Sequence, residues 1–168
     1  LIVIGSGLSG LSCVYNFLKL CEEDSTIPKL KITLIEKSLN PGGSGWTGSG
    51  SFNGIVIRKP AHELLNDLGV KYSDRHENYV VLANGVELIA ALLGKISSNE
   101  NVTMLNGFQV EEVLIQDPND VFSHVRGVAC DLVGNSMVPF SPSQYSPLYF
   151  NSSTIVSSCG HHPTEEGG

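Results

Sequence analysis

The sequence predicts an α/β fold that is built on a central parallel sheet with additional strands. Three observations predict it: an apolar stretch at residues 1–4, a Gly-x-Gly-x-x-Gly turn directly after it, and a helical pattern that follows at once. Strand, glycine turn and helix in this order are the context in which the motif indicates dinucleotide binding. We therefore expect residues 1–168 to form a single Rossmann-like domain of the FAD- or NAD(P)-binding kind.

Each glycine of the turn has its own role. Gly5 permits the tight turn, Gly7 lets the backbone approach a pyrophosphate, and Gly10 lets the helix pack closely on the strand. The N-terminus of the helix then offers unpaired N–H groups and the positive end of its dipole to the phosphates. One apolar stripe of this helix consists of Leu8, Leu11, Tyr15 and Leu18.

The second strand ends at an acidic residue. Residues 21–29 are polar and contain a proline, which predicts a loop before a buried strand at residues 30–35. Glu36 follows, at the strand tip where a carboxylate holds the ribose hydroxyls in such folds. The usual spacing from the glycines is about 20 residues, and the longer loop extends it to 26 residues after Gly10. Glu36 is therefore a candidate ribose ligand, with an ordinary strand-end carboxylate as the alternative.

A second glycine-rich stretch spans residues 41–50. Trp46 near its middle and the absence of charge favour an ordered loop that faces a ligand over a flexible linker. A strand is predicted at residues 52–57, directly after this loop.

The segment 58–62 starts a short helix, which Gly69 ends. Arg58 and His62 at this start either face the ligand or are solvated. The remaining predictions are strands at residues 79–82, 102–105, 110–115, 125–132 and 154–160, a helix at residues 86–96, and a proline-containing loop or lid at residues 134–151.

Charge, hydropathy and cysteine spacing exclude several classes of partner. The formal net charge is −7 and no basic stripe is present, so we expect no nucleic-acid partner. No apolar run approaches the roughly 18 residues of a membrane span, so we expect no membrane partner. The cysteines are widely spaced, which favours reduced thiols in an intracellular, cytoplasmic protein. An organellar targeting segment upstream is the alternative.

The ends of the chain lack two features of a complete domain of this kind. The sequence begins without a methionine, inside a strand, and stops after residue 168 without a closing element. We expect it to be part of a larger protein, incomplete at both ends, or a shortened relative of one.

Several longer motifs in the chain belong together. They lie at residues 35–38, 41–46, 56–62, 64–72, 78–81 and 157–161. In this order they resemble the thiamine thiazole synthase family, and the similarity covers nearly the whole chain.

The resemblance implies a function, cofactors and partners. Members of this family bind NAD as a substrate on this fold, remove nicotinamide, and condense the ADP-ribose part with glycine and sulfur. The product is an adenylated thiazole carboxylate, the thiazole precursor of thiamine. The sulfur comes from a cysteine of the protein itself with the help of iron, or from free sulfide in some archaeal members. The assemblies are typically homo-octamers.

The resemblance also implies ligand contacts at matching positions. Val110 matches an adenine-side backbone contact, and His161 matches a histidine that contacts the metal and the product. The full set of expected contacts is Gly5, Gly7, Ser9, Gly10, Glu36, Lys37, Ser44, Val110 and His161.

The positions that match the family's chemical residues hold other residue types. The sulfur-donating cysteine falls on Gln144, a nearby histidine on Pro139 and the iron-binding aspartate on Ser146. A glutamine amide is neither a nucleophilic thiolate nor a useful iron ligand. Cys159 is one substitute donor to consider. Three functions stay open at this point: a thiazole synthase, a non-catalytic nucleotide-binding relative, and a fragment of an FAD-dependent oxidoreductase.

Overall fold

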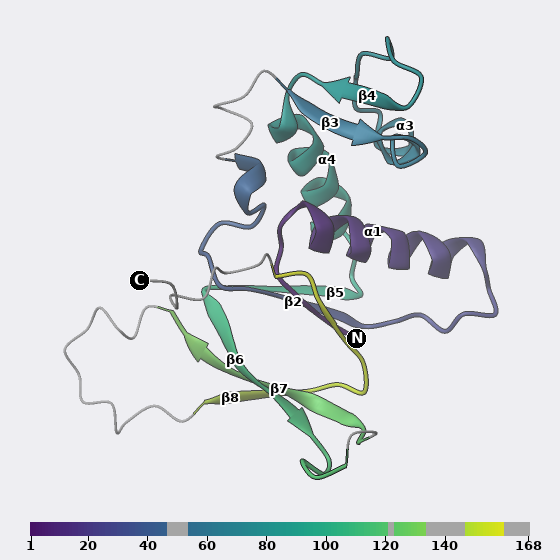
Figure 1. Ribbon diagram of the computed structural model, residues 1–168. Helices are drawn as coiled ribbons and strands as arrows, with labels where there is room; N and C mark the ends of the chain where they lie inside the picture. Colours follow the sequence, from purple (N-terminus) through teal and green to yellow (C-terminus); the bar gives the residue numbers. More distant parts are fainter. Residues whose placement is uncertain (47–53, 121–122, 134–146, 160–168) are drawn as a thin grey trace.

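A four-stranded parallel sheet forms the centre of the molecule, in the strand order β5-β2-β1-β9 (Figure 1). The structure is a computed structural model, and it describes residues 1–46, 54–120, 123–133 and 147–159. The predicted α/β fold with a central parallel sheet is confirmed. The four strands are β1 (Ile2–Ile4), β2 (Ile32–Glu36), β5 (Val102–Asn106) and β9 (Ile155–Ser157).

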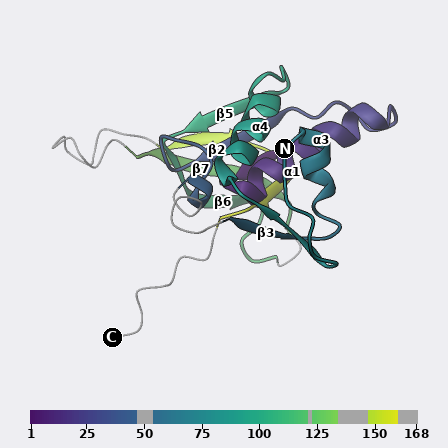
Figure 2. The same cartoon turned by 90° about the horizontal axis from the view of Figure 1, so that it is seen from above.

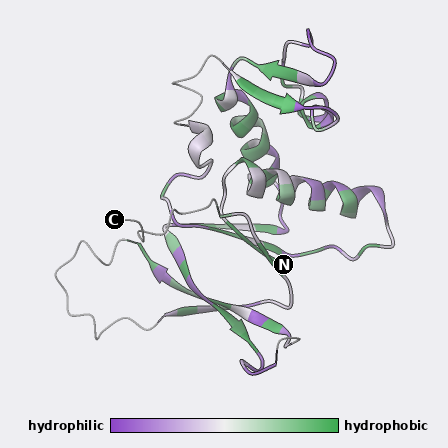
Figure 3. Ribbon diagram, viewed as in Figure 1, coloured by the Kyte–Doolittle hydropathy of each residue, from purple (hydrophilic) through white to green (hydrophobic). Residues whose placement is uncertain are grey.

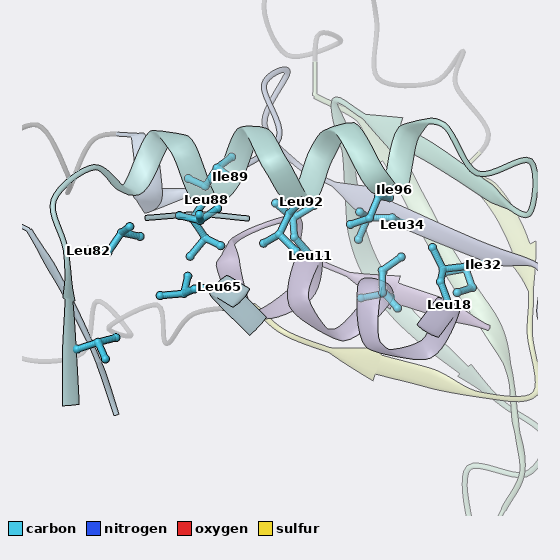
Figure 4. Close-up of a cluster of buried hydrophobic side chains, with 14 residues drawn as sticks. Leu11, Leu18, Ile32, Leu34, Leu65, Leu82, Leu88, Ile89, Leu92 and Ile96 are labelled. Carbon is cyan, nitrogen blue, oxygen red and sulfur yellow. The ribbon is translucent and has the colours of Figure 1, made fainter. Parts of the chain in front are cut away.

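Two helices cover one face of this sheet. They are α1 (Leu8–Glu23) and α4 (Gly85–Ser97), which lie over the strands in the view from above (Figure 2). The side chain of Asn84 caps α4 by accepting a hydrogen bond from the N–H of Val86 at 3.0 Å. Successive side chains of a strand point to opposite faces of the sheet. Apolar residues of both helices therefore pack against every second residue of the strands. The labelled part of this core consists of Leu11, Leu18, Ile32, Leu34, Leu65, Leu82, Leu88, Ile89, Leu92 and Ile96 (Figure 4).

A three-stranded antiparallel sheet covers the opposite face. Its strands are β6 (Phe108–Ile115), β7 (Val125–Leu132) and β8 (Leu148–Asn151), in the order β6-β7-β8. Val128 and Cys130 of β7 are buried against the central strands, and they form a second apolar cluster with Ile2, Ile4 and Ile35. The central sheet is therefore covered on both sides, as parallel sheets are.

A small hairpin sheet packs against the helices. It consists of β3 (Ile55–Arg58) and β4 (Tyr79–Leu82), which are antiparallel, and the short helix α3 (Glu63–Leu68) lies between them in sequence. In Figure 3 the strands of this hairpin and the central sheet are largely hydrophobic, whereas the connecting segments are hydrophilic. Gly69 ends α3 in the left-handed conformation with φ of +69°, as its position predicts.

The strand β8 is the main difference from the sequence prediction. Its residues fall within the segment 134–151, which the prolines and the loss of periodicity predict to be a loop. Leu148 and Phe150 pair with Cys130 and Val128 of β7, so the strand is stabilised by pairing with a distant segment and not by a local pattern.

Two element boundaries also differ. Helix α1 continues to Glu23, although the polar residues from Cys21 onwards predict a loop. A polar sequence can extend a helix whose last turn is solvated, because only its inner stripe needs apolar residues. Arg58 ends strand β3 and does not start a helix, and α3 begins only at Glu63, after Pro60. In the described part of the chain, no helix is both long and apolar enough to cross a membrane.

Candidate nucleotide-binding site

The carboxyl ends of the central strands bring the expected site residues to one edge. Ile4 at the end of β1 is in register with Ile35 of β2 and with Ser157 of β9. Gly5, Glu36 and Ser158 follow these positions, so all three lie at the same edge of the sheet. Open α/β sheets bind their ligands at this edge, outside the carboxyl ends of the strands.

The geometry of the glycine turn matches the role expected for each glycine. Gly5 has a φ of +93°, which side chains disfavour, and its N–H donates to the carbonyl of Ile35 at 2.8 Å. A Cβ on Gly10 would lie 1.9 Å from the carbonyl oxygen of Gly5, so only glycine lets the helix approach the turn this closely. A Cβ on Gly7 would meet none of the described atoms within 4 Å. Gly7 therefore borders open space, where a phosphate has room to approach its backbone.

Helix α1 begins directly after Gly7 and points its N-terminus at this space. Its first turn, residues 8–11, contains no acidic side chain that would compensate the positive end of the dipole. Ser9 is exposed in this turn. The first N–H groups of a helix have no partner within the helix, so they are available to an anion.

Glu36 is a buried carboxylate, and three hydrogen bonds from the protein satisfy it. Its side chain is only 8% exposed. Oε2 accepts from both the N–H and the hydroxyl of Ser6, each at 2.7 Å, and Oε1 accepts from the N–H of Ser38 at 2.8 Å. Burial alone would raise the pKa of Glu36, but the hydrogen bonds from Ser38 and Ser6 outweigh it and leave the pKa below its ordinary value. The carboxylate is therefore ionised at neutral pH.

The second glycine-rich segment lies against the glycine turn. The N–H of Gly42 donates to the carbonyl of Ser6 at 2.9 Å. Gly43 has a φ of +56°, and a Cβ on it would come within 3.0 Å of the Cα of Gly7. Ser44 is exposed just after this contact, at the start of a helical turn. The described part of the predicted ligand-facing loop is therefore ordered and adjacent to the turn.

Two serines at this edge, Ser6 and Ser158, are not among the site residues that the sequence predicts. Ser6 is fully buried between the glycine turn and Glu36. Ser158 directly follows β9, and its hydroxyl lies 2.8 Å from the carbonyl oxygen of Ile4 and 2.9 Å from that of Gly5. Their signal in the sequence is weak, because a serine beside a glycine is common in any loop.

The other expected residues have different surroundings. Lys37 is exposed next to Glu36. Val110 is half-buried on β6 against the second apolar cluster, and the strand starts near the site because the N–H of Gly107 donates to the carbonyl of Ser38 at 3.1 Å. His161 lies outside the described residues, as do Gln144, Pro139 and Ser146.

Arg58 and His62 lie with the hairpin sheet. The side chain of Arg58 is exposed, and His62 packs edge-on against Tyr72 with ring centroids 5.9 Å apart. A surface hollow of about 580 Å³ is lined by Arg58, Tyr79 and their neighbours. None of the residues of the glycine turn lines this hollow. The chemistry of the sheet edge, and not the size of a hollow, therefore identifies the candidate site. Within the described residues, no group of three or more His, Cys, Asp or Glu side chains is arranged to hold a metal ion.

Comparison with known proteins gives a consistent result. A model of the Thi4 family matches residues 1–165. Thiamine thiazole synthase 1, chloroplastic, of Vitis vinifera is 34% identical over 160 residues, which are 95% of this chain and 42% of that protein. The crystal structure of Thermovibrio ammonificans THI4 aligns with a TM-score of 0.75 at 25% identity, over 95% of this chain and 57% of that chain. The chain therefore spans less than half the length of the grape relative.

A second solved structure shares the fold at a greater distance. The p-nitrophenol 4-monooxygenase PnpA from Pseudomonas putida DLL-E4 aligns with a TM-score of 0.58 at 15% identity, over 95% of this chain and 40% of that chain. This likeness concerns the fold alone, and it agrees with the predicted Rossmann-like architecture.

Proposed function

The chain belongs to the Thi4 family, and from this we propose that it functions in thiamine thiazole synthesis and binds the ADP-ribose part of NAD. The single observation that supports the binding step most directly is the ionised carboxylate of Glu36 beside the glycine turn. In the proposed reaction NAD is a substrate, which loses nicotinamide and is condensed with glycine and sulfur to give an adenylated thiazole.

The geometry supports a specific placement of the nucleotide. A ribose hydroxyl donates to the carboxylate of Glu36, because an ionised carboxylate accepts hydrogen bonds only. The pyrophosphate lies against Gly7 and the N-terminus of α1, where the N–H groups and the helix dipole favour an anion. The adenine then reaches the backbone of Val110.

The remaining contacts are proposed from the family resemblance. Lys37 and Ser44 are exposed, Lys37 next to Glu36 and Ser44 in the second glycine-rich segment. We propose His161 as a contact of the product and of iron; it follows Cys159 by two residues in the sequence. The described residues alone do not provide an iron site, so no step of the reaction is assigned to the metal.

The sulfur source is proposed to be external. The position that matches the donor cysteine is Gln144, whose amide has no transferable sulfur. A free sulfide would replace the protein's own thiol, as in the archaeal members with histidine at this position. We also propose that residues 1–168 are a single dinucleotide-binding domain of an intracellular homo-octamer. The Vitis vinifera relative is named chloroplastic, so a plastid location is the alternative to the cytoplasm.

Binding is tested with the purified chain. We expect denaturation to release an adenylated compound detectable by mass spectrometry, and calorimetry to show binding of NAD and ADP-ribose. Glu36→Gln weakens ADP-ribose binding by at least about tenfold, the loss of one charge-assisted hydrogen bond, whereas Glu112→Gln, at an exposed position on β6, leaves it unchanged. Absence of both a released adenylate and NAD affinity would overturn the proposal, and release of FAD would favour an oxidoreductase fragment.

Turnover is tested separately by complementation. Expression in a strain that requires thiazole is expected to restore growth without added thiazole when sulfide is supplied. Nucleotide binding without growth under these conditions would contradict the synthase activity and leave a non-catalytic nucleotide-binding protein.

A further inference from the structure

Ser6 is the one fully buried polar side chain among the described residues, apart from the nearly buried Glu36 that it contacts. It lies between the first two glycines of the turn, where its exposed fraction is 0%. A buried hydroxyl is costly unless its hydrogen bonds are made. The bonds that satisfy Ser6 therefore identify what it is positioned to do.

Ser6 joins three segments that the proposed site needs. Its N–H and its hydroxyl both donate to Oε2 of Glu36 at 2.7 Å. Its carbonyl accepts from the N–H of Gly42 at 2.9 Å, and its Oγ lies 3.4 Å from the same nitrogen. The residue thus connects the glycine turn, the tip of β2 and the second glycine-rich segment.

The arrangement determines which carboxylate oxygen is left for a ligand. Each oxygen of an ionised carboxylate offers about two lone-pair sites. The two donors of Ser6 occupy Oε2, while Oε1 accepts from the N–H of Ser38. A ribose hydroxyl that approaches Glu36 is therefore directed to Oε1.

We propose that Ser6 is a positioning residue, which holds the carboxylate of Glu36 through Oε2, presents Oε1 to a ribose hydroxyl, and fixes the second glycine-rich segment to the turn. The ribose contact rests on the proposed nucleotide-binding function, but the effect of Ser6 on Glu36 exists without any ligand. Ser6 acts through Glu36 and Gly42 and does not itself touch the nucleotide.

Two variants test the hydroxyl. Ser6→Ala keeps both backbone contacts and removes the hydroxyl, which donates to Glu36 and also accepts from Gly42 at 3.4 Å, whereas Ser6→Thr keeps a hydroxyl. Ser158→Ala is the matched control, because it removes a hydroxyl at the same edge that contacts the carbonyls of Ile4 and Gly5 and not Glu36.

The first readout is the pKa of Glu36 in the ligand-free protein, measured by carbon-13 NMR of the carboxyl group. We expect a higher pKa in Ser6→Ala, and values equal to that of the wild type in Ser6→Thr and Ser158→Ala. An unchanged pKa in Ser6→Ala overturns the inference, whatever the protein binds. If Ser6→Ala does not fold, Ser6→Cys, which has a weaker donor of similar size, is titrated instead with the same criterion.

The second readout is the affinity for ADP-ribose as a function of pH. We expect Ser6→Ala to bind about tenfold more weakly at pH 7, the size of one hydrogen bond to a charged group, and the deficit to grow as the pH falls towards the raised pKa of Glu36. A deficit that is constant with pH would show a structural role only and would overturn the inference. Failure of the wild type to bind ADP-ribose would overturn the proposed function, while the NMR titration still decides the effect of Ser6 on Glu36.

Discussion

Glu36 is both nearly buried and charged, and its hydrogen bonds explain how the two conditions coexist. The N–H groups of Ser6 and Ser38 and the hydroxyl of Ser6 replace the water that the carboxylate loses on folding. The pKa of Glu36 is lower in the folded protein than its ordinary value. Its charge therefore stabilises the fold at every pH above that ordinary pKa.

The pH dependence of stability follows from this sign. At pH 7 we expect Glu36→Gln to be about 2 kcal/mol less stable than the wild type. The amide nitrogen of glutamine is itself a donor, and it would face the donors of Ser6 or Ser38. The part of this difference that comes from the charge of Glu36 is fully present above the ordinary pKa of 4.5 and is lost as the pH falls through the lowered pKa. Chemical denaturation of both proteins between pH 7 and pH 3 measures it, with Glu112→Gln as the control. A difference that stays constant down to pH 3 would contradict the prediction.

The cysteines differ in reactivity for a physical reason. Cys130 is fully buried, and burial, reinforced by the charges of Asp131 and Glu111, raises its pKa to about 11. Cys159 is exposed at the end of β9. Since the thiolate is the reactive form, we expect a maleimide at pH 7 to label Cys159 in the native protein and Cys130 only after unfolding. Peptide mass spectrometry measures this, and equal native labelling of the two would refute it.

At this scale the sequence predicts the residues of the glycine turn and of the strand tip better than the residues that support them. Gly5, Gly10 and Glu36 are identifiable because a turn and a strand tip require their residue types. Ser6 and Ser158 are not, because their importance arises from contacts with segments about 30 and 150 residues away. Such contacts exist only in the folded chain.

Among the elements, the junction of β1 and α1 gives the sharpest prediction. Gly10→Ala is expected to destabilise the protein by about 2–3 kcal/mol, the usual cost of forcing an atom into packed structure, because its Cβ would lie 1.9 Å from the oxygen of Gly5. Gly7→Ala is expected to keep nearly the stability of the wild type, because its Cβ would meet no described atom within 4 Å.

The same pair separates stability from binding. Gly7→Ala is expected to weaken ADP-ribose binding by at least about tenfold, because the added methyl group takes the space of the approaching pyrophosphate. Thermal unfolding and calorimetry of the two variants measure both properties. Full nucleotide affinity in Gly7→Ala would contradict the placement of the pyrophosphate.

The elements also show where sequence patterns are insufficient. The continuous apolar run of β1 and the apolar stripe of α4 agree with the sequence prediction, because the residues of each element by themselves show that it is buried. Strand β8 does not, because its residues Leu148–Asn151 are held by pairing with β7, whose paired residues lie about 20 positions earlier in the chain. Local pattern contains no information about that partner.

For the whole molecule, the larger of the two buried apolar clusters lies between the helices and the central sheet. Leu92 of α4 is fully buried between the helices and the central sheet (Figure 4). We expect Leu92→Ala to destabilise the protein by about 2–5 kcal/mol, the range for a buried leucine. Leu20→Ala on the exposed side of α1 is the control, with an expected change within about 0.5 kcal/mol. Denaturant unfolding measures both, and similar losses would contradict the assignment of the core.

The sequence predicts one part of the layered architecture and not the other. Alternation of strands and helices predicts a parallel sheet, and the sheet of β5, β2, β1 and β9 confirms it. The sequence does not predict the position of the antiparallel sheet on the opposite face, because the apolar patterns of its strands are compatible with several packings.

The pairing of β1 with β9 has a consequence for synthesis on the ribosome. Ile4 and Ser157 are register partners, although they are separated by about 150 residues. At a typical elongation rate of about 5–20 residues per second, β1 waits on the order of ten seconds for this neighbour. Until then the carbonyl of Gly5 lacks the hydroxyl of Ser158. We therefore expect the proposed nucleotide-binding edge to be completed only late in synthesis.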